Sequence, residues 1–164
     1  MAKYRKLSRT ASQRKALLRG QVTQLLATGK IVTTEAKAQE VRKIAEGLIA
    51  LAVKEKDNFE EVTVTAKVAR KDKDGKRVKE VVDGKKVTVY DEVEKTIKKD
   101  SASRLHARRQ MLKVLYKVDG KDITNKMFDE IAPKYADRNG GYTRIVKIGQ
   151  RKGDGALEVV LELV

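Results

Sequence analysis

Residues 142–164 read YTRIVKIGQRKGDGALEVVLELV, a pattern that predicts a β-hairpin. The segments YTRIVKI and ALEVVLELV are the expected strands, and the glycine-rich GQRKGDG is the turn between them. One face of the second strand is apolar from Leu157 to Leu163, and the other carries Glu158 and Glu162, because side chains alternate along a strand. The hairpin is therefore expected to close a small sheet.

Helical signals lie nearer the N-terminus. Ser12 is the expected N-cap of a first helix, in which Leu18, Val22 and Leu25 follow at helical spacing and Gly29 suits the C′ position. The β-branched stretch KIVTT that follows predicts one short strand.

A longer helix is expected to begin after Thr34, which is a favourable N-cap residue. Glu35 in its first turn complements the helix dipole. The apolar stripe of this helix consists of Val41, Ala45, Leu48 and Ala52.

The middle of the chain has the composition of β-strands. VTVTAKVAR, KRVKEVV and KKVTVYDEV are rich in Val and Thr, and the Asp-Gly pairs between them are strong hairpin signals. Residues 57–100 therefore predict a small antiparallel meander of three strands.

A third helix is expected to start near Asp100 or Ser101 and to contain SRLHARRQMLKVLYK. Thr124 is expected to cap a further short helix, which Pro133 ends or kinks. The inner face of the third helix is expected to carry Leu105, Leu112, Leu115 and Tyr116.

These elements predict an α+β fold: a compact core of about four helices with a small mixed or antiparallel sheet, closed by the C-terminal β-hairpin. An extended basic N-terminal arm and an inserted antiparallel β-meander complete it. The expected boundaries are 1–11 for the arm, 12–56 and 101–164 for the core, and 57–100 for the insertion.

The charge of the chain is strongly positive and unevenly distributed. Lys and Arg total 38 against 23 Asp and Glu, which gives a net charge of +15. Residues 53–100 hold 14 basic and 12 acidic residues, whereas the remainder holds 24 and 11. A surplus of this size indicates a polyanionic partner, and the candidates are nucleic acid, an anionic membrane or an acidic protein.

Several classes of protein are excluded by composition. The chain has no cysteine, so disulfides, thiolate metal sites and cysteine nucleophiles are absent. No apolar run approaches the length of a membrane span, and no apolar stretch follows the basic N-terminus as a secretory signal requires. We therefore expect a cytoplasmic protein that binds no membrane and forms no homo-oligomer.

The N-terminal arm is the first candidate for binding a polyanion. The first carboxylate of the chain is Glu35, and an arm of one sign repels itself unless phosphates neutralise it. The alternative is a solvated, disordered tail. The candidate RNA-binding residues here are Lys3, Arg5, Lys6, Arg9, Arg14, Lys15 and Arg19.

The helix SRLHARRQMLKVLYK is the second candidate. No acidic residue interrupts residues 101–118, whereas an ordinary solvated face mixes Glu with Lys. His106, Arg109, Lys113 and Lys117 form one basic stripe, and Arg104 and Arg108 flank the other side of the apolar face. The candidate RNA-binding residues are Arg104, His106, Arg108, Arg109 and Lys113.

Glycines next to cations form the third candidate, in DRNGGYTR and GQRKGDGA. Glycine lets backbone amides approach a phosphate closely, although hairpin turns alone also explain these glycines. The candidate RNA-binding residues are Arg138, Arg144, Arg151 and Lys152.

Signs of catalysis are missing from the sequence. His106 is the only histidine, so a transition-metal site or a catalytic triad is not expected. Neither glycine-rich stretch matches a nucleotide-binding fingerprint. The chain is therefore expected to be no enzyme, with no catalytic residues, no metal and no cofactor.

Four blocks in this order resemble one family: YRKLSRTASQRKALLRG, TTEAKAQEVRKIAE, LHARRQ and the closing hairpin are similar to bacterial large-subunit ribosomal protein seventeen. The resemblance covers residues 3–52 and 104–164. It implies a compact α+β domain bound to large-subunit ribosomal RNA toward the nascent-chain exit side. It also implies no catalysis, no obligatory cofactor, and protein neighbours that include the small thirty-second large-subunit protein.

By position in the family, the arm, the HARR helix and the GQRKGDG turn are implied to face RNA. Compact members pass from the long helix to HARR through a short link, so the resemblance implies nothing about residues 53–100. Ser8 stands where many members carry glycine.

Two other functions remain open from the residues alone. A free-standing architectural protein would bind generic duplexes, whereas a ribosomal protein co-sediments with large subunits. An RNA-processing enzyme would need a reactive pocket and turnover on RNA.

Overall fold

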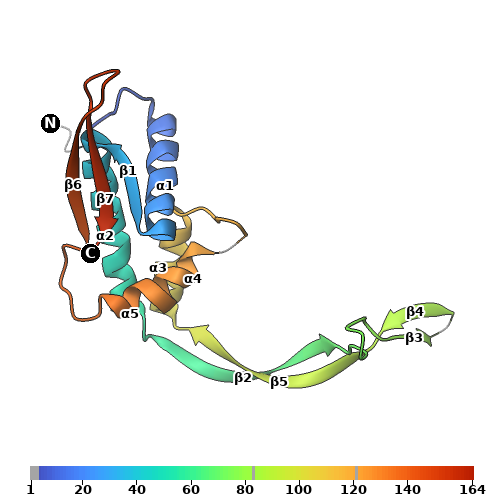
Figure 1. Cartoon of the computed structure of the whole chain (residues 1–164). Coiled ribbons are helices and arrows are strands. Elements are labelled where there is room, and N and C mark those ends of the chain that lie inside the picture. The colour runs from blue at the N-terminus through green and yellow to red at the C-terminus, as the bar shows by residue number, and fades with distance from the viewer. Residues whose placement is uncertain (1–3, 83, 121) are drawn as a thin grey trace. The chain divides into compact units, whose positions relative to one another are not determined.

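The structure is a computed structural model that describes residues 4–82, 84–120 and 122–164. The chain forms two compact units, one from the residues up to Asn58 together with Ala102–Val164, and one from Phe59–Ser101. Helices and antiparallel strands are both present, which confirms the α+β class (Figure 1).

The first unit contains a three-stranded antiparallel sheet in the order β1-β7-β6. Its strands are β1 (Lys30–Thr34), β6 (Thr143–Gln150) and β7 (Leu157–Leu163). Val159 and Leu161 on the central strand are fully buried, as the alternating pattern predicts. The expected hairpin and the short strand are therefore confirmed, and β7 joins them by pairing with both (Figure 1).

Helix α1 (Ala11–Thr28) packs against helix α2 (Glu35–Glu55) and strand β1. Its N-cap is Thr10 and not Ser12, because the Thr10 hydroxyl accepts from the Gln13 backbone N–H while the Gln13 side chain accepts from the Thr10 N–H. This reciprocal pair is a capping box. At the other end, Gly29 adopts φ 85° and donates its N–H to the Leu25 carbonyl, as expected for a C-terminal glycine.

Helix α2 (Glu35–Glu55) forms the centre of the core. Thr34 occupies its N-cap position in extended conformation, but its side chain makes no capping hydrogen bond. The expected apolar stripe is confirmed, because Val41, Ala45 and Ala52 are fully buried and Leu48 nearly so.

The second unit departs from the expected three-stranded meander. Strand β2 (Phe59–Ala69) pairs along its whole length with β5 (Tyr90–Asp100). The shorter strands β3 (Lys79–Val82) and β4 (Lys85–Thr88) form a separate hairpin. The expected third strand, KKVTVYDEV, is divided at Val89 into β4 and the start of β5, and the two parts pair with different strands.

Helix α3 (Ala102–Leu112) is shorter than expected and turns a different face inward. Its buried residues are Arg104, Ala107 and Met111, at the i, i+3, i+7 spacing of one helical face. The predicted inner face was wrong for Leu105, Leu112 and Tyr116, which are about two-fifths exposed, and right only for Leu115.

A helical segment of mixed character follows: α4 (Ile123–Lys126), a π-helical turn (Met127–Ile131) and α5 (Ala132–Lys134). Its N-cap is Asp122, whose carboxylate accepts from the Thr124 backbone N–H, so the cap expected at Thr124 was wrong by two residues. The segment ends one residue after Pro133. Among the described residues, no helix is long and apolar enough to cross a membrane.

Candidate nucleic-acid interface

The N-terminal arm is attached to the helices of the core. The Arg5 guanidinium donates to Gln39 Oε1 at 3.1 Å, and Arg14 Nε donates to the Arg5 carbonyl at 2.7 Å. Leu7 and Ser8 both have φ in the left-handed region, at 57° and 52°. The described part of the arm is therefore bent, not extended throughout.

A buried carboxylate anchors this attachment. Arg14 Nη2 lies 2.7 Å from Glu40 Oε2, and Glu40 is only 5% exposed. Burial raises the pKa of the Glu40 carboxyl, but a hydrogen bond from the Arg5 backbone N–H together with Lys43 and Arg14 holds that pKa below its ordinary value. Arg14 therefore organises the arm, and its charge is largely neutralised.

Exposed cations remain around that attachment. Lys6, Arg9 and Lys15 are exposed, and the Arg14 guanidinium stacks on the Tyr4 ring at 4.7 Å. A hollow of about 340 Å³ is lined by Tyr4, Lys6, Arg9, Ala11 and Arg14. Lys3 lies outside the described residues.

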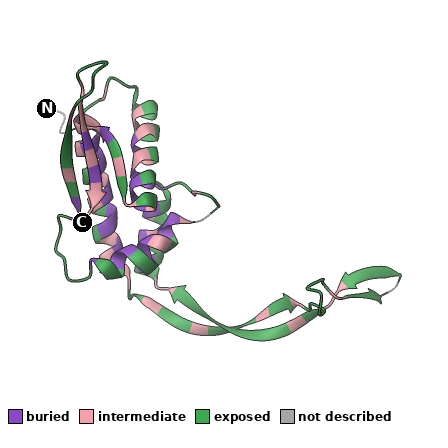
Figure 2. Cartoon of the chain, in the orientation of Figure 1, coloured by how far each residue is buried: buried purple, intermediate pink, exposed green. Residues whose placement is uncertain are grey.

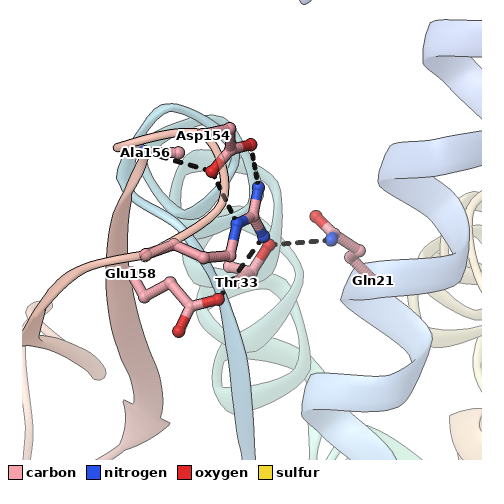
Figure 3. Close-up of polar contacts among 6 residues, drawn as sticks. Gln21, Thr33, Asp154, Ala156 and Glu158 are labelled. Atoms are coloured by element: carbon pink, nitrogen blue, oxygen red, sulfur yellow. Dashed lines mark hydrogen bonds and ion pairs between the residues drawn. The ribbon is translucent and has the colours of Figure 1, made fainter.

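The turn between β6 and β7 lies at the same end of the core, because Glu158 just after the turn pairs with Thr34, where α2 begins. Arg151 donates to both carboxylate oxygens of Asp154, at 2.8 and 2.5 Å, and to Glu158 at 3.4 Å. Both acidic side chains point toward this guanidinium (Figure 3). The hydrogen bond and charge of Arg151 lower the pKa of Asp154 to about 2, and the Asp154 hydrogen bond raises the pKa of Arg151.

This pairing changes the expected role of the turn. Arg151 closes the loop by binding Asp154, whose carboxylate also accepts from the Ala156 backbone N–H at 3.2 Å (Figure 3). Both cations of the turn are exposed, but the Arg151 guanidinium is already bound by carboxylates, so Lys152 is the better candidate for a ligand contact.

Arg19 holds the core together. Its Nε donates to the Val114 carbonyl at 2.9 Å, and its guanidinium stacks on the Tyr116 ring at 4.1 Å. The Tyr116 backbone N–H in turn donates to Thr23 Oγ1. These contacts tie the middle of α1 to the segment after α3.

The basic residues of α3 divide between the core and the surface. Arg104 is 3% exposed, with its guanidinium 4.6 Å from the centre of the Phe128 ring. Arg108 donates to Asn125 Oδ1 at 2.6 Å. The exposed members are His106, Arg109 and Lys113, and Lys113 follows the last helical residue, so the stripe does not continue to Lys117 along a helix.

Two further candidates lie on or near β6. Arg144 donates twice to Glu162 on the neighbouring strand, at 2.9 and 2.5 Å. Arg138 is exposed and donates to the Gly140 carbonyl at 3.3 Å. Both residues are exposed, but the Arg144 guanidinium is paired with a carboxylate across the strands, whereas Arg138 contacts only a backbone carbonyl within its own loop.

Two cations of α2 were not among the predicted RNA-binding residues, and each pairs with a carboxylate of the same helix, Arg42 with Glu46 and Lys43 with Glu40. Arg42 and Lys43 are exposed and line a hollow of about 380 Å³ with Gln39, the residue that binds Arg5. The sequence could have indicated that both side chains are exposed, because both come just after Val41 and lie outside the apolar stripe of the helix. Within the described ranges, no three or more His, Asp or Glu residues gather as a metal site would require.

The chain matches the model of one known protein family. The model of the family described as Ribosomal protein L17 matches residues 17–164. The chain belongs to the ribosomal protein L17 family. This confirms the resemblance found in the sequence.

Curated relatives in this family carry the name large ribosomal subunit protein bL17. The protein from Lachnospira eligens is 71% identical over 178 aligned positions, and that from Acetivibrio thermocellus is 49% identical over 174. The protein from Clostridium botulinum strain Hall is 42% identical over 164 positions. Each comparison covers the whole of both chains, so it includes the arm residues that precede the family match.

Proposed function

We propose that this chain is a structural constituent of the large ribosomal subunit and binds large-subunit ribosomal RNA. Membership of the ribosomal protein L17 family supports this function. The structural observation that carries it is the gathering of exposed cations from the arm, the start of α1 and the β6–β7 turn at one end of the core.

The predicted RNA-binding residues fall into two roles. Exposed cations for which the described residues provide no carboxylate or ring partner contact phosphate, and cations that bind a carboxylate or stack on a ring hold the surface in shape. The positioning group is Arg14, Arg19, Arg104, Arg144 and Arg151. The contacting group is Lys6, Arg9, Lys15, His106, Arg109, Lys113, Arg138 and Lys152, with Lys3, Arg5 and Arg108 beside it.

The binding energy comes mainly from phosphate neutralisation. Each cation that neutralises a phosphate releases condensed counterions, so affinity depends steeply on salt. The net charge of +15 would repel itself in a free protein, and the RNA removes that repulsion. Such a role requires no catalytic residue and no cofactor, and it places the chain within the ribosome.

Neighbouring large-subunit proteins are the expected further partners. The thirty-second large-subunit protein is the specific neighbour that the family resemblance implies. Cross-linking mass spectrometry on purified large subunits tests this assignment. The assignment is overturned if the cross-links from the first unit reach neighbouring proteins but never the thirty-second large-subunit protein.

Sucrose-gradient sedimentation at low and high salt, with immunodetection across the fractions, tests the function. The protein should co-sediment with large subunits, and the triple variant Lys6→Ala, Arg9→Ala, Lys15→Ala should dissociate at lower salt. The slope of log affinity against log salt for isolated ribosomal RNA should fall in magnitude by roughly 2 to 3, because three phosphate contacts are lost.

A matched control removes the same charge from the opposite end of the core. Lys30 begins β1, Lys54 lies in the last turn of α2, and Lys134 ends α5. The variant Lys30→Ala, Lys54→Ala, Lys134→Ala should change the salt slope less than the first triple variant. Equal slopes for the two triples would show that net charge, not the arm end, determines binding.

A further inference from the structure

The second unit consists of a stem and a tip that differ in charge. The stem is the β2–β5 ribbon, which begins at the pair Phe59–Asp100 and ends at the pair Ala69–Tyr90. The tip is the segment 71–88, which contains β3 and β4. The stem carries four lysines and six carboxylates, whereas the tip carries seven basic and four acidic side chains. The near balance of charge in the middle of the chain therefore combines an acidic stem with a basic tip.

The register of the stem places opposite charges across from each other. Directly opposed residues of an antiparallel pair share a face and interact. Three of the four lysines of the stem are opposed by a carboxylate: Lys99 by Glu60, Lys98 by Glu61 and Lys67 by Glu92. The stem therefore offers a ligand no excess of positive charge.

The register of the tip places like charges across from each other. Lys71 forms an antiparallel bridge with Arg77. The residues on either side of this pair make the flanking backbone hydrogen bonds, both at 2.9 Å, so it is the closely spaced kind of antiparallel pair, in which side chains are nearest. Like charges in direct opposition destabilise such a pair. An anion bound between Lys71 and Arg77 would remove this repulsion.

The β3–β4 hairpin carries further cations without an opposing carboxylate. Lys79 lies opposite Thr88 and Lys86 lies opposite Val81. These four side chains share one face, because alternate residues of a strand point the same way. Glu80, the one carboxylate of these two strands, lies on the other face. Lys79, Lys86 and Val81 are exposed, and the hairpin is drawn almost wholly in the exposed colour in Figure 2.

The first turn of the tip is closed by its own carboxylate. Asp72 Oδ1 accepts from the backbone N–H of Asp74 at 3.2 Å and from that of Lys76 at 2.9 Å. This side chain therefore faces the backbone of its own loop and fixes the turn that holds the Lys71–Arg77 pair together. Within the part of the chain that the structure describes, no cation of the tip forms an ion pair with a carboxylate.

We propose that the tip is a second phosphate-binding element, which contacts large-subunit ribosomal RNA through Lys71, Arg77, Lys79 and Lys86. None of these residues belongs to the predicted RNA-binding set, all of which lies in the first unit. The inference rests on the proposed function, because that function brings the chain to RNA. Phosphate bound at the tip relieves the repulsion between Lys71 and Arg77 and releases condensed counterions, so both effects favour binding.

The spread of these cations favours RNA over an acidic protein. A single carboxylate neutralises one cation, whereas a nucleic-acid backbone presents a continuous row of phosphates. The cations of the tip occupy both its first turn and the β3–β4 hairpin, so a row of charges matches them better than a single one. The stem then acts as the spacer that carries the tip to its RNA.

Two full-length variants that remove equal charge test the proposal. The tip variant combines Lys71→Gln, Arg77→Gln, Lys79→Gln and Lys86→Gln. The stem control combines Lys67→Gln, Lys95→Gln, Lys98→Gln and Lys99→Gln. All eight residues lie in the second unit, so the first unit should melt as in wild type.

Binding to isolated ribosomal RNA should separate the two variants. The slope of log affinity against log salt should fall in magnitude by roughly 3 to 4 in the tip variant, because four phosphate contacts are lost, and by less than about 1 in the stem control. Equal slopes in the two variants would show that net charge acts without a site at the tip, and would overturn the proposal.

Cross-linking within assembled large subunits locates the contact. The chain has no cysteine, so a single introduced cysteine carries a photo-cross-linker at one position. Val81→Cys lies on the face of Lys79 and Lys86, and Thr63→Cys is the matched exposed position on the stem. Ser12→Cys, at the start of α1, reports on the first unit. Primer extension maps adducts on ribosomal RNA, and mass spectrometry identifies adducts with protein.

The probe at position 81 should label ribosomal RNA several-fold more than the probe at position 63. Equal labelling, or adducts from position 81 to protein alone, overturns the proposal. If position 12 labels ribosomal RNA and position 81 does not, the proposed function stands and this inference fails. If neither position labels ribosomal RNA, or if the unmodified chain does not enter large subunits, the proposed function fails and this inference fails with it.

Discussion

Arg14 Nη2 and Glu40 Oε2 lie 2.7 Å apart, and this ion pair joins α1 to α2 where the N-terminal arm attaches. The same carboxylate accepts from Lys43 at 3.5 Å. Because Glu40 is almost fully buried, its charge depends on these donors and stabilises the fold only while they remain.

Glu40→Gln should lower the free energy of unfolding by about 1.5–3 kcal/mol, because charged hydrogen bonds at a buried site are replaced by neutral ones. Urea unfolding measures the change. The control is Glu130→Gln, which removes an exposed pairing with Lys126 at 3.9 Å and should cost less than about 0.5 kcal/mol. Equal losses in the two variants would contradict the assigned role of Glu40.

The Glu40 effect should also depend on pH. The folded-state pKa lies below the ordinary value of 4.5, so the stabilisation is fully present above about pH 4.5 and is lost as the pH falls through the folded-state pKa. The stability difference between wild type and Glu40→Gln should therefore shrink in acid. A difference that stays constant down to pH 3 would show that ionisation of Glu40 does not contribute.

Arg104 and Arg109 should separate stability from RNA binding, although both belong to the same basic helix. Arg104→Ala removes a buried stem and a ring contact with Phe128, so it should cost about 2 kcal/mol or more of stability. Arg109→Ala, at an exposed position, should leave the melting temperature nearly unchanged and weaken binding to ribosomal RNA. Thermal melting and filter binding on both variants decide the matter, and interchanged phenotypes would refute the assignment.

In the β6–β7 turn, Arg151 and Lys152 should likewise differ, with Arg151 shaping the turn and Lys152 contacting RNA. In wild type the Asp154 carboxyl should titrate near pH 2, and in Arg151→Ala its pKa should return toward 3.8, because the guanidinium that favours the ionised form is gone. Carbon NMR of the carboxyl group measures both values. Lys152→Ala should leave the pKa of Asp154 unchanged and reduce the affinity for RNA. A changed Asp154 pKa in this variant would show that the lysine also shapes the turn.

Ser8→Gly should stabilise the arm. Ser8 has φ 52°, a conformation that costs an L-residue roughly 1–2 kcal/mol and costs glycine little, so the net gain should be about 0.5–1 kcal/mol after the entropy of glycine. Limited proteolysis at the arm should slow in the variant. Ser12→Gly, inside the first turn of α1, should have the opposite effect because glycine disfavours a helix.

Residues 59–101 should be removable without unfolding the first unit. Asn58 Nδ2 donates to Ser103 Oγ at 2.5 Å, so the two ends that flank the insertion lie side by side and a short Gly-Ser link can join them. The deletion variant should retain cooperative melting and bind ribosomal RNA. Loss of folding would falsify the independence of the two units, whereas folding without RNA binding would place RNA contacts in the insertion.

Local signals in the sequence determined much of the fold. The capped and periodic helices α1 and α2, and the closing hairpin, follow from residues that lie close together along the chain, such as Gly29 and the stripe from Val41 to Ala52. Charge patterning likewise indicated a polyanionic partner and separated residues 53–100 from the rest, because composition requires no knowledge of contacts. The family resemblance followed from four short blocks.

The tertiary structure decided which of two possible faces of helix α3 is buried. On α3 the spacing permits an inner face with Leu105 and Leu112 or one with Arg104, Ala107 and Met111. The second was chosen because Phe128, distant in sequence, offers a ring on which the Arg104 guanidinium stacks. In the insertion, the single strand expected from KKVTVYDEV is divided between two pairings, because its first part pairs with β3 across a turn and its second part pairs with the distant β2.

The tertiary structure also decides which cations are paired with a carboxylate and which are not. Lys6, Arg9 and Lys152 are exposed, whereas Arg14 and Arg151 each bind a carboxylate. A sequence shows how many charges a segment carries, but a charge is neutralised only by a group that the fold brings within a few ångströms. The number of cations was therefore determined by the sequence alone, and their division between shaping the surface and contacting phosphate by the distances that the tertiary structure sets.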